Sequence, residues 1–597
     1  MGIPQDMTNW FYITLVRWIF LRRFACNQST LGKGRQLRNG SGVIVGYIFY
    51  LYFPGVCKSY SVCLRTEMMK LAKAIQQILY YILTVISWIV TPVASAIFSW
   101  IYDGSSKVVP PVEDDVLLQS AVTLARKIRS RELRAVDVME KYISRVTEMH
   151  DHLNTVVARR FSEAREEAQA LDEELDRKAA DEKFSEKNKP LLGVPLSVKE
   201  AFCVTGMPNS GGLVSRGIFR AESDCPVVGR LREAGAIPYC MTNVSELCMW
   251  YESANRLYGR SNNPYHTGRI VGGSSGGEGC NIASGGAVVG IGSDIGGSIR
   301  MPAFFNGIFG HKPSRGLVPN DGQFPIATGK DRDLMSTGPM CRYMDDILPM
   351  LKVMAGSNKQ ANLGRQVDVS QLCVYNIVDD GGSLLVSKVD TQLKQAQAKV
   401  VHFLETSLGA KVKTISIPKF KFAVDIWAAK MTTSGGTTFC EYMGYEGPAI
   451  NPHLEFLKWC IGRSKHTLPA IALGCVEKLD HLLEGVNRKA LESFEKLETE
   501  MNELLDENSV IIYPSHPKVA PYHNQPLMYP FNWAYTGLFN TLGLPVTQVP
   551  LGLSKEGLPL GVQIVAGMNQ DAVSIAVAQE LEDGQIAGWV NPGTDSF

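Results

Sequence analysis

The sequence predicts an α/β fold for most of the chain, and two observations support this. Hydrophobic residues make up 45% of the 597 residues and charged residues 20%, which is typical of a globular protein with a large core. From Pro190 onward, β-prone segments alternate with helical patterns as far as the C-terminus, as in a sheet covered by helices. Length alone would suggest about four domains, but no internal repeat or low-complexity segment divides the chain.

The N-terminal region differs from the rest of the chain. Residues Ala74 to Tyr102 are 29 residues without a charge, long enough for a helix to cross a bilayer. The run carries Trp and Tyr residues that suit membrane interfaces, and its alternative interpretation is a buried core helix. We therefore expect four regions: an N-terminal extension over 1–73, a transmembrane helix over 74–102, a linker over 103–115 and a catalytic domain over 116–597.

The charges around this run predict its orientation. Four basic residues precede it closely, whereas Lys107 is followed by three acidic residues. Positive charge favours the cytoplasmic side, so we expect a single-pass protein of an endomembrane with its catalytic domain on the non-cytoplasmic side. A second uncharged run, at 39–57, contains glycines and Pro54 and is left open as an additional span.

The pattern becomes helical after the linker. Apolar residues recur at helical spacing from Leu117 to Val146. The highly charged segment Ser162 to Lys187 predicts a solvated helix rather than a binding site. Pro190 to Val198 is strand-like and leads directly to Lys199.

Glycines are concentrated between Gly272 and Ser314, where the backbone must adopt positive φ or approach another group closely. They flank Ser274, Ser275 and Ser298. A short buried strand is predicted over Ala287 to Ile291, followed by a turn and a helix that begins near Ser298. A serine at a helix N-terminus is surrounded by free N–H groups, which suits a nucleophile beside an oxyanion hole.

These motifs resemble the amidase-signature serine hydrolases. The resemblance rests on GGSSGGE from Gly272, on GSDIGGSIR from Gly292, and on GVPLSVKE from Gly193, which contains Lys199. It extends from about Leu117 to Trp589, and the segment SELCMWYESANRLYGRSNNPYHTGRIVGGSSGGEG is closest to the fatty-acid amide hydrolase branch. The family implies one large catalytic domain with a central mixed β-sheet covered by helices, which overrides the estimate from length.

The resemblance also implies the chemistry. Ser298 is expected to be the nucleophile, Ser274 the proton relay and Lys199 the base that later returns a proton to the leaving amine. Because a free lysine has a pKa of about 10.4, Lys199 must be buried to start neutral. The family places a cis peptide bond before Ser274.

The remaining expected site residues surround Ser298. The N–H groups of Ile295, Gly296 and Gly297, together with that of Ser298 itself, are the expected oxyanion donors. Ser275 and Arg300 are expected to support the site, and Asp294 to anchor the turn rather than act as a base.

Several classes of partner are disfavoured. A net charge of +1 gives no electrostatic case for binding nucleic acid. The thirteen cysteines are scattered and lack a CxxC pair, so we expect no metal site, and nothing in the sequence calls for a cofactor. The expected partners are a membrane and a lipid-like substrate; a homodimer is left open.

Competing interpretations remain. Gly273-Ser274-Ser275-Gly276-Gly277 is formally a nucleophile elbow with Ser275 as nucleophile and His516 or His523 as base, but the segment before it is a poor strand. The glycines at 290 and 292 fail the dinucleotide-binding spacing. The chain could also be a membrane-anchored binding protein with an inactive hydrolase domain, or a subunit of a transamidosome.

The substrate class rests mainly on the resemblance, which implies fatty-acid amides, either N-acylethanolamines or primary amides. The segment His453 to Leu479 is rich in apolar residues and has two interpretations: a membrane-facing cap through which an acyl chain enters, or an ordinary amphipathic helix pair in the core. An amidase of non-lipid amides is the competing function.

Overall fold

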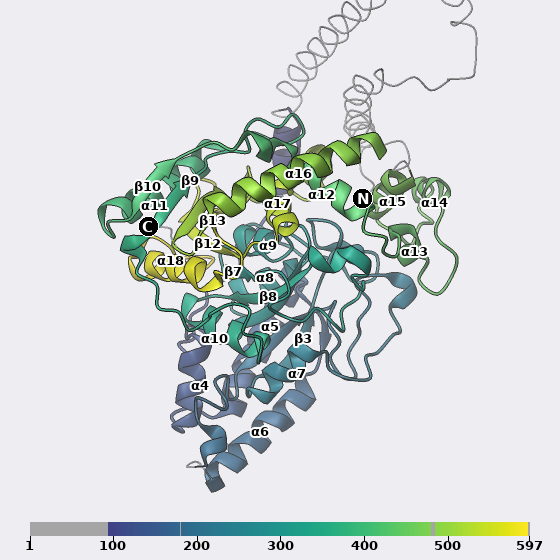
Figure 1. Cartoon of the computed structure of the whole chain (residues 1–597). Helices are drawn as coiled ribbons and strands as arrows, with labels where there is room; N and C mark the ends of the chain where they lie inside the picture. Colours follow the sequence, from purple (N-terminus) through teal and green to yellow (C-terminus); the bar gives the residue numbers. More distant parts are fainter. Residues whose placement is uncertain (1–92, 179–180, 479–483, 595–597) are drawn as a thin grey trace, which may run out of the picture. The chain divides into compact units, whose positions relative to one another are not determined.

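The computed structural model describes residues 93–178, 181–478 and 484–594 (Figure 1). They belong to two units: residues 1–104 with 481–486, and residues 105–480 with 487–597. In the first unit, residues 93–102 are helical. The rest of the span expected at 74–102, the extension over 1–73 and the apolar run at 39–57 lie outside the described residues. Among the described helices, none combines the length and hydropathy that a membrane crossing requires.

The second unit is built on a large β-sheet. Its strands in the described residues are β1 (Val156–Arg159), β2 (Pro195–Lys199), β3 (Ile237–Thr242), β6 (Val289–Asp294), β7 (Phe309–Lys312), β8 (Ser336–Cys341), β9 (Cys373–Asn376), β10 (Lys411–Thr414), β11 (Ser509–Pro514), β12 (Val546–Leu553) and β13 (Pro559–Ala566). These eleven lie in the order β1-β3-β2-β6-β8-β7-β12-β13-β11-β9-β10, and the short strands β4 (Ala254–Asn255) and β5 (Gly259–Arg260) pair separately.

The sheet is mixed, as the family resemblance implied. Strand β2 is parallel to both of its neighbours, β3 and β6, whereas β6 and β8 are antiparallel. Parallel strands end at the same edge of a sheet. Lys199 at the end of β2 and Asp294 at the end of β6 therefore lie at one edge, where the glycine-rich turn begins.

The helices surround this sheet (Figure 1). Among the described residues they are α4 (Ala121–Arg129), α5 (Ala135–Leu153), α6 (Phe161–Lys178), α7 (Pro226–Glu233), α8 (Gly276–Ala283), α9 (Arg300–Phe305), α10 (Met344–Ala355), α11 (Thr391–Thr406), α12 (Ala423–Thr432), α13 (Phe439–Gly444), α14 (Pro452–Cys460), α15 (Leu468–Lys478), α16 (Glu484–Leu504), α17 (Ala534–Leu542) and α18 (Asp571–Asp583).

Strand β6 is buried on both faces and separates two helical layers. A Cβ at Gly290 would lie 2.0 Å from Oε2 of Glu278 on α8, so this face of the strand is pressed against α8. Val289 and Ile291 alternate with Gly290 and point the other way, into the main apolar core that contains Ile347 of α10. Helices α8 and α10 therefore cover opposite faces.

Helix α6 occupies the charged segment in which a solvated helix was expected. Its inward stripe is apolar except for Asp172, which is fully buried. The Asp172 carboxylate accepts hydrogen bonds from the N–H groups of Ala135 and Val136, at 3.0 Å each, where α5 begins. A negative charge at a helix N-terminus is stabilising, so one acidic residue of this segment is structural and not solvated.

Candidate active site

Lys199 ends β2 and is completely buried. Its Nζ lies 2.7 Å from Ser274 Oγ and 3.0 Å from Ser293 Oγ, with the Ser293 carbonyl oxygen at 3.3 Å. The structure thus joins two residues that are 75 positions apart in the chain, and adds Ser293 to the lysine's partners.

The environment of Lys199 favours a neutral amine. Burial lowers its pKa from the ordinary lysine value, because the charged form loses its hydration. The opposing, raising effects of Cys248, Asp294 and Glu278 are smaller. A lysine that can release its proton near neutral pH is what a general base requires.

Ser274 and Ser298 lie progressively closer to solvent than the fully buried Lys199. The Gly273–Ser274 peptide bond is cis, as the resemblance implied, and Ser274 is 1% exposed. Ser298 is 8% exposed and lies in the turn between β6 and α9. Its carbonyl accepts a hydrogen bond from the Ser275 N–H at 3.2 Å, which connects the two serine segments. In the described chain, no hydrogen bond joins the Ser298 hydroxyl to Ser274.

Three of the four expected oxyanion donors are unengaged. Within the described residues, the N–H groups of Ile295, Gly296 and Ser298 have no acceptor. The N–H of Gly297 differs from the expectation, because it donates to Asp294 Oδ1 at 2.7 Å. Gly297 has φ +122°, a region that favours glycine.

Asp294 anchors this turn through a buried ion pair with Arg300. Both side chains are fully buried, and Arg300 donates from Nη2 to Oδ1 at 2.9 Å and from Nε to Oδ2 at 3.1 Å. The N–H of Ile299 also donates to Asp294, at 3.0 Å. Burial alone would raise the pKa of Asp294, but Arg300 and these N–H groups outweigh it and hold that pKa well below its usual range. A carboxylate so engaged is unsuited to act as a base.

Ser275 lies in a different setting from the one that a nucleophile elbow requires. An elbow needs a strand that leads into the serine, but the described chain has no strand between β5 and α8. The Ser275 hydroxyl contacts the Ser293 carbonyl oxygen at 3.4 Å. His523 bonds to Glu252 at 3.0 Å, and the ring of His516 packs edge-on against Phe305. Ser275 directly precedes α8 and contacts the carbonyl groups of Ser293 and Ser298.

The structure also explains the glycines at 290 and 292 without a nucleotide. A side chain at Gly290 would collide with Glu278, and a Cβ at Gly292 would lie 2.9 Å from Ser275 Oγ. The two glycines leave room against β6 for Glu278 of α8 and for Ser275, which directly precedes that helix.

Besides Ser293, two further neighbours of Lys199 were missed from the sequence. Glu278 is fully buried and accepts hydrogen bonds from Ser197 Oγ and, at 2.8 Å, from Thr242 Oγ1; its position in the GGSSGGE motif was the available signal. The Cys248 thiol lies beside Lys199 and Ser274. Cys248 has φ +57°, a backbone state imposed by the fold, and no sequence signal pointed to it.

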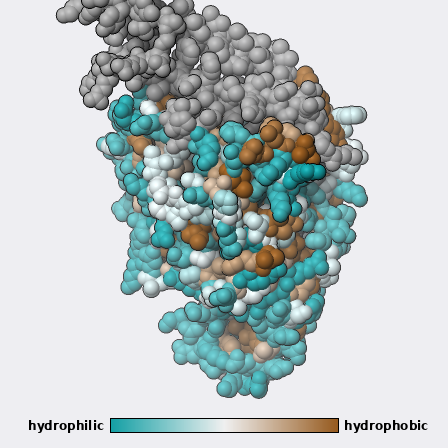
Figure 2. All heavy atoms as spheres, turned by 90° about the vertical axis from the view of Figure 1, so that its right-hand side faces the viewer, coloured by the Kyte–Doolittle hydropathy of each residue, from teal (hydrophilic) through white to brown (hydrophobic). Residues whose placement is uncertain are grey.

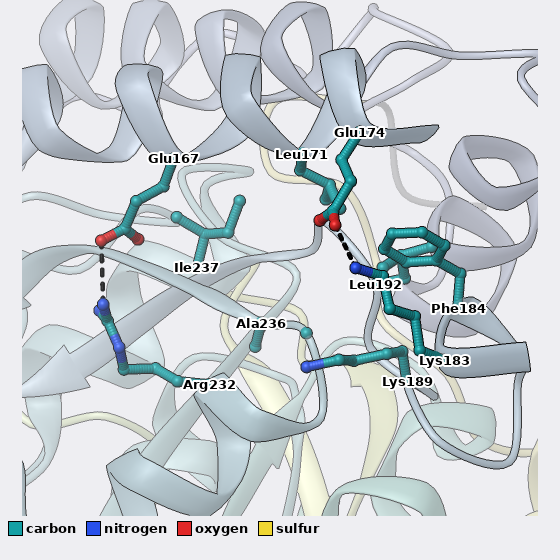
Figure 3. A pocket seen from close by; sticks show the side chains of 11 residues that line it. Glu167, Leu171, Glu174, Lys183, Phe184, Lys189, Leu192, Arg232, Ala236 and Ile237 are labelled. Carbon is teal, nitrogen blue, oxygen red and sulfur yellow. Dashed lines mark hydrogen bonds and ion pairs between the residues drawn. The ribbon is translucent and has the colours of Figure 1, made fainter. Parts of the chain in front are cut away.

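A pocket elsewhere in the second unit is lined by other residues. A pocket of about 310 Å³ lies between α6, β3 and the segment that leads to β2 (Figure 3). Four of its charged side chains form two ion pairs, because Glu167 bonds to Arg232 at 2.9 Å and Glu174 bonds to Lys183, while Lys189 donates to the Glu233 carbonyl. It contains none of the expected site residues.

The chain is also similar to known proteins. A model of the amidase family matches residues 137–573. Fatty-acid amide hydrolase 2 of Homo sapiens is 51% identical over 497 residues, covering 82% of this chain and 93% of the relative. Fatty-acid amide hydrolase 2-A of Danio rerio is 49% identical, covering 81% and 92%.

Solved structures show the same fold. An amidase crystal structure is 25% identical with a TM-score of 0.63, covering 78% of this chain and all of that one. A fatty acid amide hydrolase is 23% identical with a TM-score of 0.63, covering 80% and 86%. Because the family model spans more than half of the chain, and relatives share about half of its residues, this protein belongs to the amidase-signature family of hydrolases.

Proposed function

We propose that this protein hydrolyses fatty-acid amides to a free fatty acid and an amine through Ser298, Ser274 and Lys199. The observation that carries the mechanism is the buried contact between Lys199 Nζ and Ser274 Oγ at 2.7 Å, beside a more accessible Ser298. The relatives that share about half of the residues are fatty-acid amide hydrolases by name, and they support the choice of substrate.

In the acylation step, neutral Lys199 takes the proton of Ser274, which takes that of Ser298. The Ser298 oxygen then attacks the amide carbon, and the N–H groups of Ile295 and Gly296 stabilise the oxyanion. On collapse, the C–N bond breaks and the proton returns through Ser274 to the leaving nitrogen. Water attacks the acyl-enzyme through the same relay and releases the fatty acid.

Exposed apolar residues on α14 support a lipid-like substrate. Leu454 is 58% exposed, Leu457 62% and the following Ile461 67%, whereas Leu468 and Ile471 of α15 are buried. The expected cap segment is therefore divided into an outward apolar helix and a core helix. Figure 2 shows apolar surface gathered among hydrophilic residues on one face of the molecule. We assign α14 to contact with a lipid surface, through which acyl chains would enter.

Membrane anchoring is part of this proposal. The uncharged run over 74–102 supports a single span, with 1–73 as the preceding extension, 103–115 as a linker and 116–597 as the catalytic domain. Flanking charges support an endomembrane with the catalytic domain on its non-cytoplasmic side. Extraction of membranes with sodium carbonate tests the anchor, and release of the protein into the supernatant would refute it.

The catalytic assignment is tested by mapping the adduct of a fluorophosphonate with peptide mass spectrometry. We expect labelling at Ser298 in the wild type and loss of labelling in Lys199→Ala. A label at Ser275 would instead favour the nucleophile elbow. A folded protein without any label would favour a binding protein with an inactive hydrolase domain.

The substrate assignment is tested with amides of increasing acyl length, as N-acylethanolamines and as primary amides. Each buried CH₂ contributes about 0.8 kcal/mol, so kcat/KM should rise with length. A flat profile would leave an amidase of non-lipid amides.

A further inference from the structure

The backbone that precedes Ser298 is held from outside by side chains of two helices. Asn540 of α17 donates to the Asp294 carbonyl at 2.9 Å, and Trp427 of α12 donates from Nε1 to the Ile295 carbonyl at 2.8 Å. Thr536 of α17 donates to the Gly296 carbonyl, also at 2.8 Å. Three consecutive carbonyl groups therefore have fixed partners.

When a carbonyl group is held in place, the orientation of the N–H group of the next residue is set as well. In a planar trans peptide unit, the C=O of one residue and the N–H of the following residue point in opposite directions. The peptide bonds from Asp294 to Ser298 are trans. A carbonyl held toward α12 or α17 thus turns the following N–H away from these helices. This matters most at Gly296 and Gly297, because glycine restricts its own backbone least.

Trp427 makes the least ambiguous of these contacts. An indole has a single N–H donor, and the Ile295 carbonyl is its acceptor. The Thr536 hydroxyl also has one proton, but it lies 2.8 Å from both the Gly296 and Trp533 carbonyl oxygens and must divide between them. The peptide unit that Trp427 holds ends in the Gly296 N–H, which has no acceptor in the described residues.

The indole is itself held in place. Its ring packs edge-on against Trp533, with centroids 4.6 Å apart. A Cβ at Gly296 would lie 3.5 Å from Trp427 Nε1, so the ring is in contact with the turn. A rigid donor on a packed helix suits a group that must not reorganise during the reaction.

We infer that Trp427 is a positioning residue for the oxyanion hole: it holds the Ile295 carbonyl so that the Gly296 N–H faces the reacting carbonyl oxygen. The inference rests on the proposed function. Trp427 itself touches no reacting atom in this scheme, and its effect passes through the Gly296 N–H.

The test compares Trp427→Phe with Trp533→Phe. The first keeps an aromatic ring but removes the N–H that bonds to Ile295. The second removes an indole N–H that has no acceptor in the described chain, and so controls for a change in the same aromatic pair. Loss of one oxyanion donor costs about 10²–10³ in rate. In Trp427→Phe the Gly296 N–H is loosened rather than lost, so kcat should fall by about 10-fold to 100-fold, with KM unchanged.

Two further readouts separate positioning from packing. A trifluoromethyl ketone analogue of the substrate forms a tetrahedral adduct with the serine, and its affinity should fall by the same factor as kcat. The rate of fluorophosphonate labelling at Ser298 should fall likewise, and Trp533→Phe should leave all three values near those of the wild type. The inference is overturned if Trp427→Phe retains wild-type values, or if both variants lose activity equally.

Labelling also separates this inference from the substrate assignment. A wild type that labels at Ser298 but hydrolyses no fatty amide would refute the substrate, while the labelling rate of Trp427→Phe would still decide the role of Trp427. A wild type that does not label at Ser298 would refute both.

Discussion

Replacing Arg300 by methionine tests how the turn between β6 and α9 is stabilised. In the native protein, Arg300 and Asp294 are both fully buried and share two hydrogen bonds, at 2.9 and 3.1 Å. Arg300→Met supplies an unbranched apolar side chain in place of the guanidinium and leaves the Asp294 carboxylate buried without its ion-pair partner. Removing one partner of a buried pair costs about 3–5 kcal/mol, since an uncompensated charge remains.

The size of the effect follows from the size of the folded unit. Unfolding entropy is about 2.1 cal/mol/K per residue, which gives about 1 kcal/mol/K for the roughly 490 residues of the second unit. Arg300→Met should therefore lower Tm by about 3–5 °C, measured by circular dichroism at one scan rate. A Tm within about 1 °C of the wild type would refute the reasoning.

The stability difference between the wild type and Arg300→Met should depend on pH, and its direction follows from the pKa of Asp294. In the wild type the lowered pKa of Asp294 contributes stability above its unfolded value, and this is lost as pH falls through the folded pKa. Without Arg300, burial raises the pKa of Asp294, so its carboxylate takes up a proton as pH falls. The Tm difference between the variant and the wild type should therefore become smaller at low pH. Asp294→Asn combined with Arg300→Met should recover most of the lost Tm at neutral pH. A double variant no more stable than the single would show that buried charge is not the cause.

Three further predictions concern the groups around β2 and β6. Lys199→Met should lower kcat by about 10²–10⁴-fold. In the wild type, kcat/KM should rise with pH through a pKa below the ordinary lysine value; an acid limb that survives in the variant would exclude Lys199 as the base. Glu278 has its pKa raised to about 8 by burial, so ionising it costs stability as pH rises from about 4.5 to 8. In Glu278→Gln this residue cannot ionise, so the variant should gain stability relative to the wild type across that window in urea titrations. A difference in unfolding free energy that stays constant with pH would contradict this. Gly290→Ala would place a Cβ 2.0 Å from Glu278 Oε2 and should destabilise the protein by about 1–3 kcal/mol. Combining it with Glu278→Ala should relieve this loss. If the stability losses of the two substitutions simply add, steric overlap with Glu278 is not the cause.

Much of the candidate site could be predicted because its signals are local. The glycines around Ser274 and Ser298 are needed wherever the backbone turns sharply or meets another segment closely, and this requirement can be recognised in the sequence itself. The strand that carries Lys199 was predicted by its β-prone residues, and the structure has it as β2 over Pro195–Lys199. The alternation of strands and helices was sufficient for the α/β class.

Only the tertiary structure decided which side chains contact the backbone before Ser298, because these partners are distant in sequence. Trp427 reaches the Ile295 carbonyl across 132 residues, and Thr536 reaches that of Gly296 across 240. No local pattern predicts these contacts, because they depend on how α12 and α17 pack on the sheet. The engagement of the Gly297 N–H by Asp294 likewise depends on Arg300, whose guanidinium is itself held by Asn540 at 2.6 Å.

The physical reason is the range of each interaction. A chain's own backbone preferences act over a few residues, so the glycine-rich turns and the strand-like segment before Lys199 could be recognised locally, whereas the roles expected of Ser298, Ser274 and Lys199 came from the family resemblance. The burial that lowers the pKa of Lys199 and the side chains that hold the turn between β6 and α9 come from segments that meet only once the strands are ordered in the sheet. The sequence by itself therefore determined which residues are candidates, and the packed fold decided the electrostatic state and geometry in which they lie.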